Sequence, residues 1–277
     1  MRKSQNRKRR NNRNDLNNNL SVFIIIMLIA ILSVLLLKNP NLPFIKKEDP
    51  VKTDTNDLEL EEGNIGKTPK EKIEDVEPKV ESKGITIIVD PGHGGIDPGK
   101  VGVNGSLEKE INLSIALKLT QELESNGYDV IMTRTDDNGL YLEGDSNKKV
   151  ADLRKRVEIV NNSDATVAIS IHQNSFTQES SKGAQVFYFG NSEESKKFAL
   201  IMQDQLKESL QDGNRREAKA DNSYYLLKNT NCPIIIVECG FLSNYNEANL
   251  LIEESYQEKL AKAIYLGLDT YIEQGKE

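Results

Sequence analysis

The chain contains only two histidines, His93 and His172, and each follows a short apolar stretch. His93 lies in a glycine-rich turn after residues 85–89, and His172 follows residues 165–171. Both stretches predict buried β-strands. Because binding sites gather at the carboxyl edge of parallel strands, we expect both imidazoles at one edge of one sheet. Imidazole is a preferred zinc ligand, so the pair indicates a zinc site, although either histidine alone would more often close a turn.

A catalytic zinc site commonly takes three protein ligands and leaves one position for water. Glu108 is the candidate third ligand, since it begins the predicted helix after the His93 turn and can reach back to the same edge. Acidic residues are also favoured at helix N-termini by the helix dipole, which would explain Glu108 without a metal. Glu110 is a local rival, and spacing alone does not separate the two.

Glu238 directly follows the apolar run 234–237. A carboxylate at the end of so apolar a strand costs free energy unless it has a partner. Beside a metal-bound water it would serve as a general base and then as a general acid. The alternative is a buried salt bridge with Arg134 or Arg156. We favour the catalytic role, because Glu238 is predicted at the same sheet edge as both histidines.

The two cysteines, Cys232 and Cys239, lie on either side of a predicted strand at residues 233–237. An extended strand would hold them roughly 23 Å apart. A disulfide tolerates only about 7 Å between α-carbons, so we predict that they are not bonded to each other. We expect two small, buried apolar residues. Cys239 with His172 also defines a rival hypothesis, a cysteine hydrolase.

The elements that must position these residues alternate along the chain. Apolar, β-branched stretches predict strands at residues 85–89, 128–133, 165–171, 184–189, 224–227 and 233–237. Apolar residues at helical spacing predict helices at residues 107–126, 153–161, 193–210 and 256–272, with Gly127 capping the first. Strands that are apolar on both faces and alternate with helices predict an α/β three-layer sandwich, with a mainly parallel central sheet flanked by helices.

A basic leader and an apolar stretch precede this domain. Residues 1–19 are rich in arginine and lysine, and residues 20–37 are apolar apart from two serines. Eighteen helical residues span about 27 Å, close to the ~30 Å of a bilayer core. The basic flank predicts that the leader stays in the cytoplasm and the rest lies outside. No small-residue cleavage site follows, so we expect an uncleaved single-pass anchor in the cytoplasmic membrane.

Residues 38–83 are rich in charged residues, Asn and Pro, and their apolar residues show no period. Such a segment predicts a flexible charged linker, which leaves residues 84–277 as the catalytic domain. The chain has a net charge of −7 despite its basic leader, so this domain is acidic. An acidic surface argues against nucleic acid as a partner.

Six motifs, in order, give residues 85–272 a close resemblance to the zinc-dependent N-acetylmuramoyl-L-alanine amidases of the type-3 amidase family. The motifs are DPGHGGIDPG at 90–99, SLEKEINL at 106–113, TR at 133–134, LRKRVEIVN at 153–161, SIHQN at 170–174 and PIIIVECGFLSN at 233–244. The resemblance implies that His93, Glu108 and His172 bind one Zn²⁺ and that Glu238 is the catalytic carboxylate. It also implies that Asn174 lies near the metal.

This resemblance implies hydrolysis of the amide between N-acetylmuramic acid and L-alanine in peptidoglycan, with glycan strands that carry stem peptides as substrate. The anchor, linker and single domain resemble the sporulation and germination subgroup, whose members act on spore cortex toward muramic δ-lactam. Only a short stretch separates His172 from the next predicted strand, so we expect no inhibitory helix there. Control would come from an activating protein partner or timed expression. A non-catalytic wall-binding protein of the same fold is the second rival.

Overall fold

The computed structural model describes residues 81–275 of the chain. The predicted leader, the predicted anchor and nearly all of the predicted linker lie outside these residues, so the proposed division of the chain remains a prediction. Within the described part, no helix is long and apolar enough to cross a membrane. The elements follow one another as β1 (Thr86–Pro91), α2 (Glu108–Glu124), β2 (Asp129–Met132), α3 (Lys148–Asn161), β3 (Val167–Asn174), β4 (Gln185–Tyr188), α4 (Glu193–Leu210), β5 (Lys219–Ala220), α5 (Tyr225–Asn229), β6 (Ile234–Phe241), α6 (Tyr245–Leu250) and α7 (Glu254–Gln274).

The strands form one six-stranded sheet in the order β2-β1-β3-β6-β4-β5. The central strands are parallel, since β1 pairs in parallel with β2 and β3, and β3 pairs in parallel with β6. Strand β4 runs antiparallel to β6 and carries β5 parallel to itself at the edge. The predicted α/β class and mostly parallel sheet are confirmed, and the antiparallel β4–β6 pair makes the sheet mixed.

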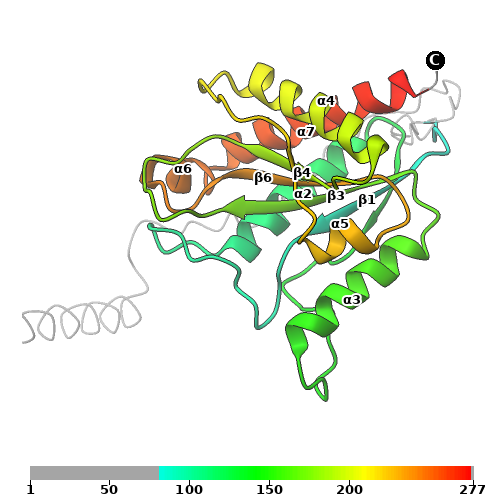
Figure 1. Ribbon diagram of the computed structural model, residues 1–277, viewed down its shortest axis with the longest axis horizontal. Coiled ribbons are helices and arrows are strands. Elements are labelled where there is room, and N and C mark those ends of the chain that lie inside the picture. The colour runs from blue at the N-terminus through cyan, green and yellow to red at the C-terminus, as the bar shows by residue number, and fades with distance from the viewer. Residues whose placement is uncertain (1–80, 276–277) are drawn as a thin grey trace, which may run out of the picture. The chain divides into compact units, whose positions relative to one another are not determined.

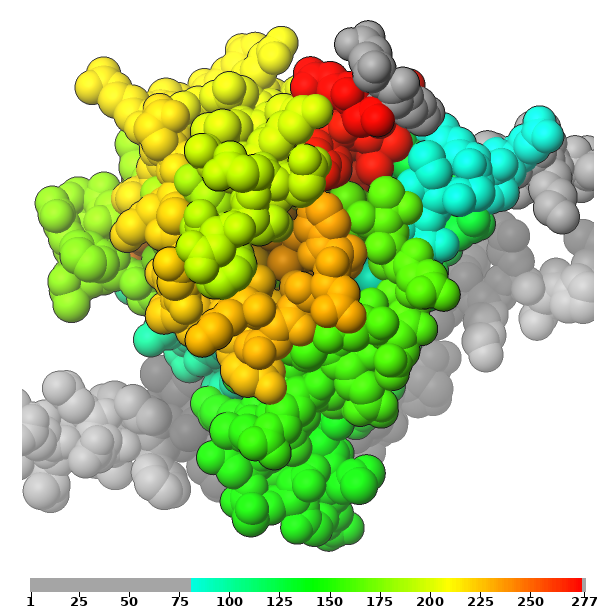
Figure 2. Space-filling view, turned by 45° about the vertical axis from the view of Figure 1, so that its right-hand side comes forward, coloured from blue at the N-terminus to red at the C-terminus, as the bar shows by residue number. Residues whose placement is uncertain are grey.

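Helices cover both faces of the sheet (Figure 1). On one face α2, α4 and α7 pack against alternate residues of the central strands in a large buried cluster that includes Ile169 and Val237. On the other face α3 and α5 cover a smaller cluster that includes Ile88 and Ile236. Figure 2 shows α3, in green, beside the orange segment around α5 at the surface of this second layer. Successive residues of one strand therefore pack into different layers.

The structure corrects the expected strand at residues 224–227. Residues Tyr225–Asn229 form the short helix α5, in which Leu226 and Leu227 are buried and Tyr225 is exposed. A run of four apolar residues fits either a buried strand or one turn of a buried helix, so its pattern could not decide.

Several predicted boundaries also move. Helix α3 begins at Lys148, five residues before the predicted start, because the Asn147 side chain accepts a hydrogen bond from Val150 N and caps it. Helix α2 is capped at Ser125, and Gly127 takes its positive φ of 83° beyond the cap. Helix α6 was not predicted, although Asn244 is a typical N-cap residue and accepts bonds from two backbone N–H groups of α6.

Candidate metal centre and active site

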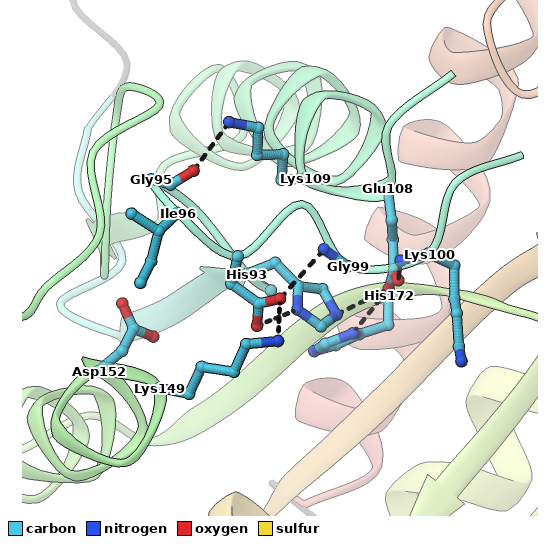
Figure 3. Close-up of polar contacts among 12 residues, drawn as sticks. His93, Gly95, Ile96, Gly99, Lys100, Glu108, Lys109, Lys149, Asp152 and His172 are labelled. Atoms are coloured by element: carbon cyan, nitrogen blue, oxygen red, sulfur yellow. Dashed lines mark hydrogen bonds and ion pairs between the residues drawn. The ribbon is translucent and has the colours of Figure 1, made fainter. Parts of the chain in front are cut away.

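Three side chains from three elements converge at the carboxyl edge of the parallel strands. His93 Nε2 lies 3.2 Å from Glu108 Oε1, and His172 Nδ1 lies 3.0 Å from the same oxygen. One ligand atom from each residue falls within 4.8 Å of the others. Figure 3 shows the two imidazoles and the carboxylate pointing toward one another. The structure therefore brings together the three residues that the sequence indicated as metal ligands.

The choice between the two glutamates follows from the start of α2. Glu108 is the first residue of the helix and is 2% exposed, whereas Glu110 is exposed to solvent. Backbone N–H groups of Lys100 and Gln173 donate to the two oxygens of Glu108 at 2.8 and 3.1 Å. The carboxylate is thus fixed from both sides and faces the histidines.

Two glycines allow this close approach. A Cβ at Gly92 would lie 2.2 Å from His172 Nε2. A Cβ at Gly99, where φ is +68°, would lie 2.5 Å from Glu108 Oε2 and 2.7 Å from His93 Cδ2. Separations below 3.0 Å are not tolerated, so neither position accepts a side chain without displacing a ligand. Gly92 and Gly99 of the DPGHGGIDPG motif are therefore packing requirements of the site.

Asp97 fixes the orientation of His93. His93 Nδ1 donates to Asp97 Oδ2 at 2.9 Å, and Lys149 Nζ donates to Asp97 Oδ1 at 2.7 Å. A carboxylate oxygen only accepts, so the proton resides on Nδ1 and Nε2 is directed to the site. Carboxylate–histidine pairs of this kind orient ligands around metals. The role of Asp97 was not predicted from the sequence, although Asp97 lies four residues after His93 in the same motif.

Two buried arginines hold the backbone of the His93 turn. Arg134 donates to the carbonyl oxygens of Pro91 and Gly92 at 2.9 and 3.0 Å. Arg156 donates to the carbonyls of Pro91 and His93, and it pairs with Asp90 at 2.5 Å. This network corrects the alternative of an Arg134 or Arg156 salt bridge to Glu238, because both guanidinium groups serve the turn instead. It also supports the left-handed backbone of His93, with φ of 62°.

The charges of the site perturb one another. Burial opposes ionisation of Glu108, but its close contacts with His172 and His93 outweigh burial and hold the pKa of Glu108 far below its usual range. Burial alone would lower the pKa of His93, yet Glu108 and Asp97 raise it. Both shifts arise from the close approach of the Glu108 carboxylate to the imidazoles, and they favour the ionised form of that carboxylate. A carboxylate in this form is an electrostatic match for a cation.

Glu238 lies beside this centre, on the neighbouring strand. It pairs in register with His172 across the parallel β3–β6 ladder, so both side chains emerge on the face covered by α3 and α5. The strand does not end at Val237 as predicted but continues to Phe241. Burial raises the pKa of Glu238 to about 7. A carboxyl group with that pKa is suited to taking up and returning a proton near neutral pH.

Cys239 points to the opposite face from Glu238. It is 1% exposed and belongs to the cluster under α2, α4 and α7. Burial raises the pKa of its thiol, so the thiolate that a cysteine hydrolase needs is disfavoured. Both cysteines are free, as predicted, while Cys232 is only partly buried. Cys239 and His172 therefore lie on opposite faces of the sheet, which argues against the cysteine hydrolase hypothesis.

A cavity of about 430 Å³ opens over the three converging residues. Glu238, Tyr224, Asn174 and Lys100 line it together with both histidines and Glu108. A second cavity of about 340 Å³ adjoins it between the His93 turn, α3 and α5, and shares both histidines and Tyr224. A larger cleft of about 870 Å³ near α6 contains none of these residues. The predicted proximity of Asn174 to the site is borne out by this lining.

The donor set fits a divalent metal ion. Two imidazoles and one carboxylate are the protein ligands of a common class of catalytic zinc site, which leaves a further position open. The Asp97 carboxylate binds the far nitrogen of the His93 ring, as carboxylates commonly do for histidines that bind metals. Asn112, fully buried on α2, donates to Gly92 O at 3.2 Å and accepts from Gln173 Nε2 at 3.1 Å, so the ligand-bearing elements are also tied together below the site.

Comparison with known proteins agrees with this geometry. The Amidase_3 model, which describes N-acetylmuramoyl-L-alanine amidases, matches residues 87–270. The chain is 42% identical over 191 residues to the germination-specific N-acetylmuramoyl-L-alanine amidase of Bacillus subtilis (strain 168), covering 68% of this chain and 80% of that protein.

Solved structures give the same relationship. The chain is similar to the CwlD amidase from Clostridioides difficile, solved in complex with the GerS lipoprotein, at 45% identity and a TM-score of 0.66 over 68% of this chain and 98% of that one. An N-acetylmuramoyl-L-alanine amidase from Clostridium difficile 630 is 32% identical, with a TM-score of 0.62 over 69% and 98% of the two chains.

The family match spans most of the described domain, from β1 to α7, and includes all four residues that the sequence indicated as functional. The resemblance carried by the six motifs is thereby confirmed. The converging histidines and glutamate are consistent with the metal site typical of this family. The chain belongs to the Amidase_3 family of N-acetylmuramoyl-L-alanine amidases, enzymes that act on peptidoglycan.

Proposed function

We propose that this amidase is a zinc enzyme in which His93, Glu108 and His172 hold the ion and Glu238 is the catalytic carboxylate. The observation that carries the proposal is the convergence of three ligand atoms within 4.8 Å, with Glu238 in register beside His172. Imidazole and carboxylate groups are common zinc ligands. When bound, zinc would act as a Lewis acid and lower the pKa of a bound water toward neutrality. The bond cleaved is the amide between the lactyl group of N-acetylmuramic acid and L-alanine.

Glu238 performs the proton transfers of this hydrolysis. Its carboxylate takes a proton from the attacking water and returns it to the nitrogen of L-alanine as the amide bond breaks. A pKa raised to about 7 by burial balances the two tasks, because the group must be a base before attack and an acid after it.

The test joins metal content with activity. Purified protein is analysed for metal and then incubated with purified peptidoglycan, with and without a chelator, while new L-alanine amino termini are counted. One zinc per chain and release that the chelator abolishes are expected. Release from fully metal-free protein would refute the proposal. Zinc-loaded protein that binds glycan yet never releases peptide would instead favour the wall-binding rival.

A cysteine mechanism makes a different prediction. Cys239→Ala should retain most of the activity, because the thiol lies on the other face of the sheet from His172. Glu238→Ala should retain zinc and lose most turnover. The reverse result, with activity lost in the cysteine variant and retained in the glutamate variant, would support the rival.

The biological substrate we propose is spore cortex, where peptide removal from muramic acid precedes δ-lactam formation. Support comes from similarity to an amidase named as germination-specific and from the predicted anchor and linker. Cortex from a strain that lacks this gene should contain no muramic δ-lactam, as measured by chromatography of muropeptides. Normal δ-lactam content would restrict the enzyme to vegetative wall.

We also propose that residues 20–37 anchor the protein in the cytoplasmic membrane with residues 84–277 outside, and that a protein partner assists it. The partner proposal rests on the similar CwlD amidase, which was solved in complex with the GerS lipoprotein. Protease added to intact protoplasts should remove the domain and leave the leader protected. Affinity purification from sporulating cells should recover a lipoprotein in a fixed ratio.

A further inference from the structure

Tyr224 lies next to the catalytic carboxylate without belonging to any sequence motif identified above. It is the N-cap residue of α5, and its side chain lines both cavities that adjoin the metal ligands. Its phenolic oxygen lies 3.4 Å from Glu238 Oε1. The phenol approaches Glu238 from the layer above the sheet, whereas the β3–β6 ladder holds Glu238 from within the sheet.

Apart from Tyr224, no side chain or backbone group of the described residues donates a hydrogen bond to the Glu238 carboxylate. Its side chain is nearly buried, yet Oε2 has no hydrogen-bond partner, and Tyr224 offers the one hydrogen bond to this side chain from residues 81–275. A buried carboxylate that lacks donors is costly and free to rotate about its last torsion. Orientation of this group therefore depends on the phenol.

The position of Tyr224 is itself well defined. Its ring packs at 59° against Phe187 of β4, with ring centroids 5.7 Å apart. Lys228 N donates to Tyr224 O at 3.2 Å in the first turn of α5, and Asp221 N donates to Tyr188 O at 2.9 Å. The segment that carries the phenol is thus fastened to strand β4. Burial raises the pKa of Tyr224, so its hydroxyl remains a donor at neutral pH.

We propose that Tyr224 is a positioning residue for the amidase reaction, which donates its O–H to Glu238 Oε1 and holds the carboxylate in the orientation used for proton transfer. The inference rests on the proposed role of Glu238. A separation of 3.4 Å is long for such a bond, and bonds of this kind commonly shorten when substrate fills the site. Tyr224 acts through Glu238, so its hydroxyl should affect turnover and leave substrate binding unchanged.

The experiment compares the full-length chain with its Tyr224→Phe variant, which keeps the ring against Phe187 and removes only the hydroxyl. Hydrolysis of a soluble muramoyl peptide is followed over a range of concentrations, with zinc content and Tm measured on the same samples. We expect kcat to fall about 10- to 100-fold, the effect of losing one hydrogen bond to a charged group, with KM and zinc content unchanged and with Tm high enough that the variant is folded at the assay temperature. Tyr245→Phe is the matched control and should behave like the wild type, since Tyr245 is exposed and lines neither cavity that adjoins the metal ligands.

A double-mutant cycle distinguishes positioning from an independent contribution. In a Glu238→Gln background, adding Tyr224→Phe should change the residual rate less than twofold, because the group that Tyr224 positions is already altered. Equal losses in both backgrounds would overturn the inference, as would a Tyr224→Phe enzyme within twofold of wild type or one that changes only KM. Wild-type protein that releases no peptide would overturn the proposed function and this inference together, whereas the other outcomes concern Tyr224 alone.

Discussion

The imidazole of His172 and the backbone of Gly92 are in such close contact that the site has no room for a methyl group there. A Cβ at Gly92 would lie 2.2 Å from the imidazole. Gly92→Ala should therefore displace His172 and lower zinc affinity at least 10-fold, the size of a typical ligand-orientation defect. Isothermal titration with Zn²⁺ measures this directly. Gly144→Ala is the control, because a Cβ at Gly144 meets nothing within 4 Å, and equal affinity in the two variants would contradict the packing argument.

The pKa of Glu238 predicts how activity depends on pH. Burial raises this pKa to about 7, and the group must be ionised to accept a proton. Activity should therefore be present above this pKa and fall as pH decreases through it, tenfold per pH unit in kcat/KM. Because a bound cation favours the ionised form, the midpoint should lie at or below about 7. Zinc content is measured at each pH, and a flat profile down to pH 5 with zinc retained would be incompatible with this role.

At the residue scale, the sequence allowed the two histidines and Glu238 to be predicted because few residue types suit their chemistry. Spacing alone did not separate Glu108 from Glu110, since both lie in the first turn of α2, and it was the family resemblance that implied Glu108, the one that the fold buries. Asp97 and Tyr224 were not predicted, because their roles depend on partners brought close by the fold. Arg134 and Arg156 were predicted only as possible partners of Glu238. Both arginines donate to backbone carbonyls of the His93 turn, and acceptors of that kind leave no trace in a sequence.

At the element scale, helix α3 supports the site through Lys149, which donates to Asp97, and above all through Arg156. Arg156 is 2% exposed, pairs with Asp90 and Asp152, and donates to the carbonyls of the His93 turn. Arg156→Met leaves two buried carboxylates without their cation, so the free energy of unfolding should fall by about 3–5 kcal/mol. Arg156→Lys should lose nearly as much, because an ammonium group cannot reproduce the planar set of donors.

Urea unfolding followed by circular dichroism measures this loss. Arg154→Met, on the exposed side of the same helix, is the control and should change stability by less than about 0.5 kcal/mol. If Arg156→Met had the same free energy of unfolding as this control, the buried network would make no net contribution to stability. Asp90 adds a pH dependence, since Arg156 and two hydroxyls overcome burial and lower its pKa. Its stabilisation is present above the usual aspartate range and is lost as pH falls through the lowered pKa.

The elements themselves were largely predictable from the sequence. Strands β1, β3 and β6 were identified from β-branched, apolar runs, and α2, α4 and α7 from the spacing of their apolar residues. The failures share one cause, which is short length. Four apolar residues before Lys228 did not distinguish a strand from α5, and the six-residue α6 offers too little periodicity to detect.

At the scale of the whole molecule, metal binding should be coupled to folding. The three candidate ligands come from the turn after β1, from α2 and from β3. Because these elements meet only in the folded domain, the unfolded chain does not preserve the site. Free Zn²⁺ at 1,000 times its dissociation constant should add about 4 kcal/mol of stability. For a domain of this size that raises Tm by about 8–16 °C, and calorimetry with and without a chelator checks it. The Tm of His172→Ala should respond little to zinc, and an equal response would place the metal elsewhere.

The β3–β6 ladder has a consequence for how this enzyme can change. His172 and Glu238 occupy paired positions on adjacent strands, so the sheet repeat of about 4.8 Å sets the spacing of their backbones. The surrounding loops, including residues 175–184 and 211–218, take no part in that spacing. Changes in the length or sequence of these loops should therefore leave that backbone spacing intact. The sheet fixes the distance between the two strands that carry His172 and Glu238, and the loops are the part of the domain that can vary without altering it.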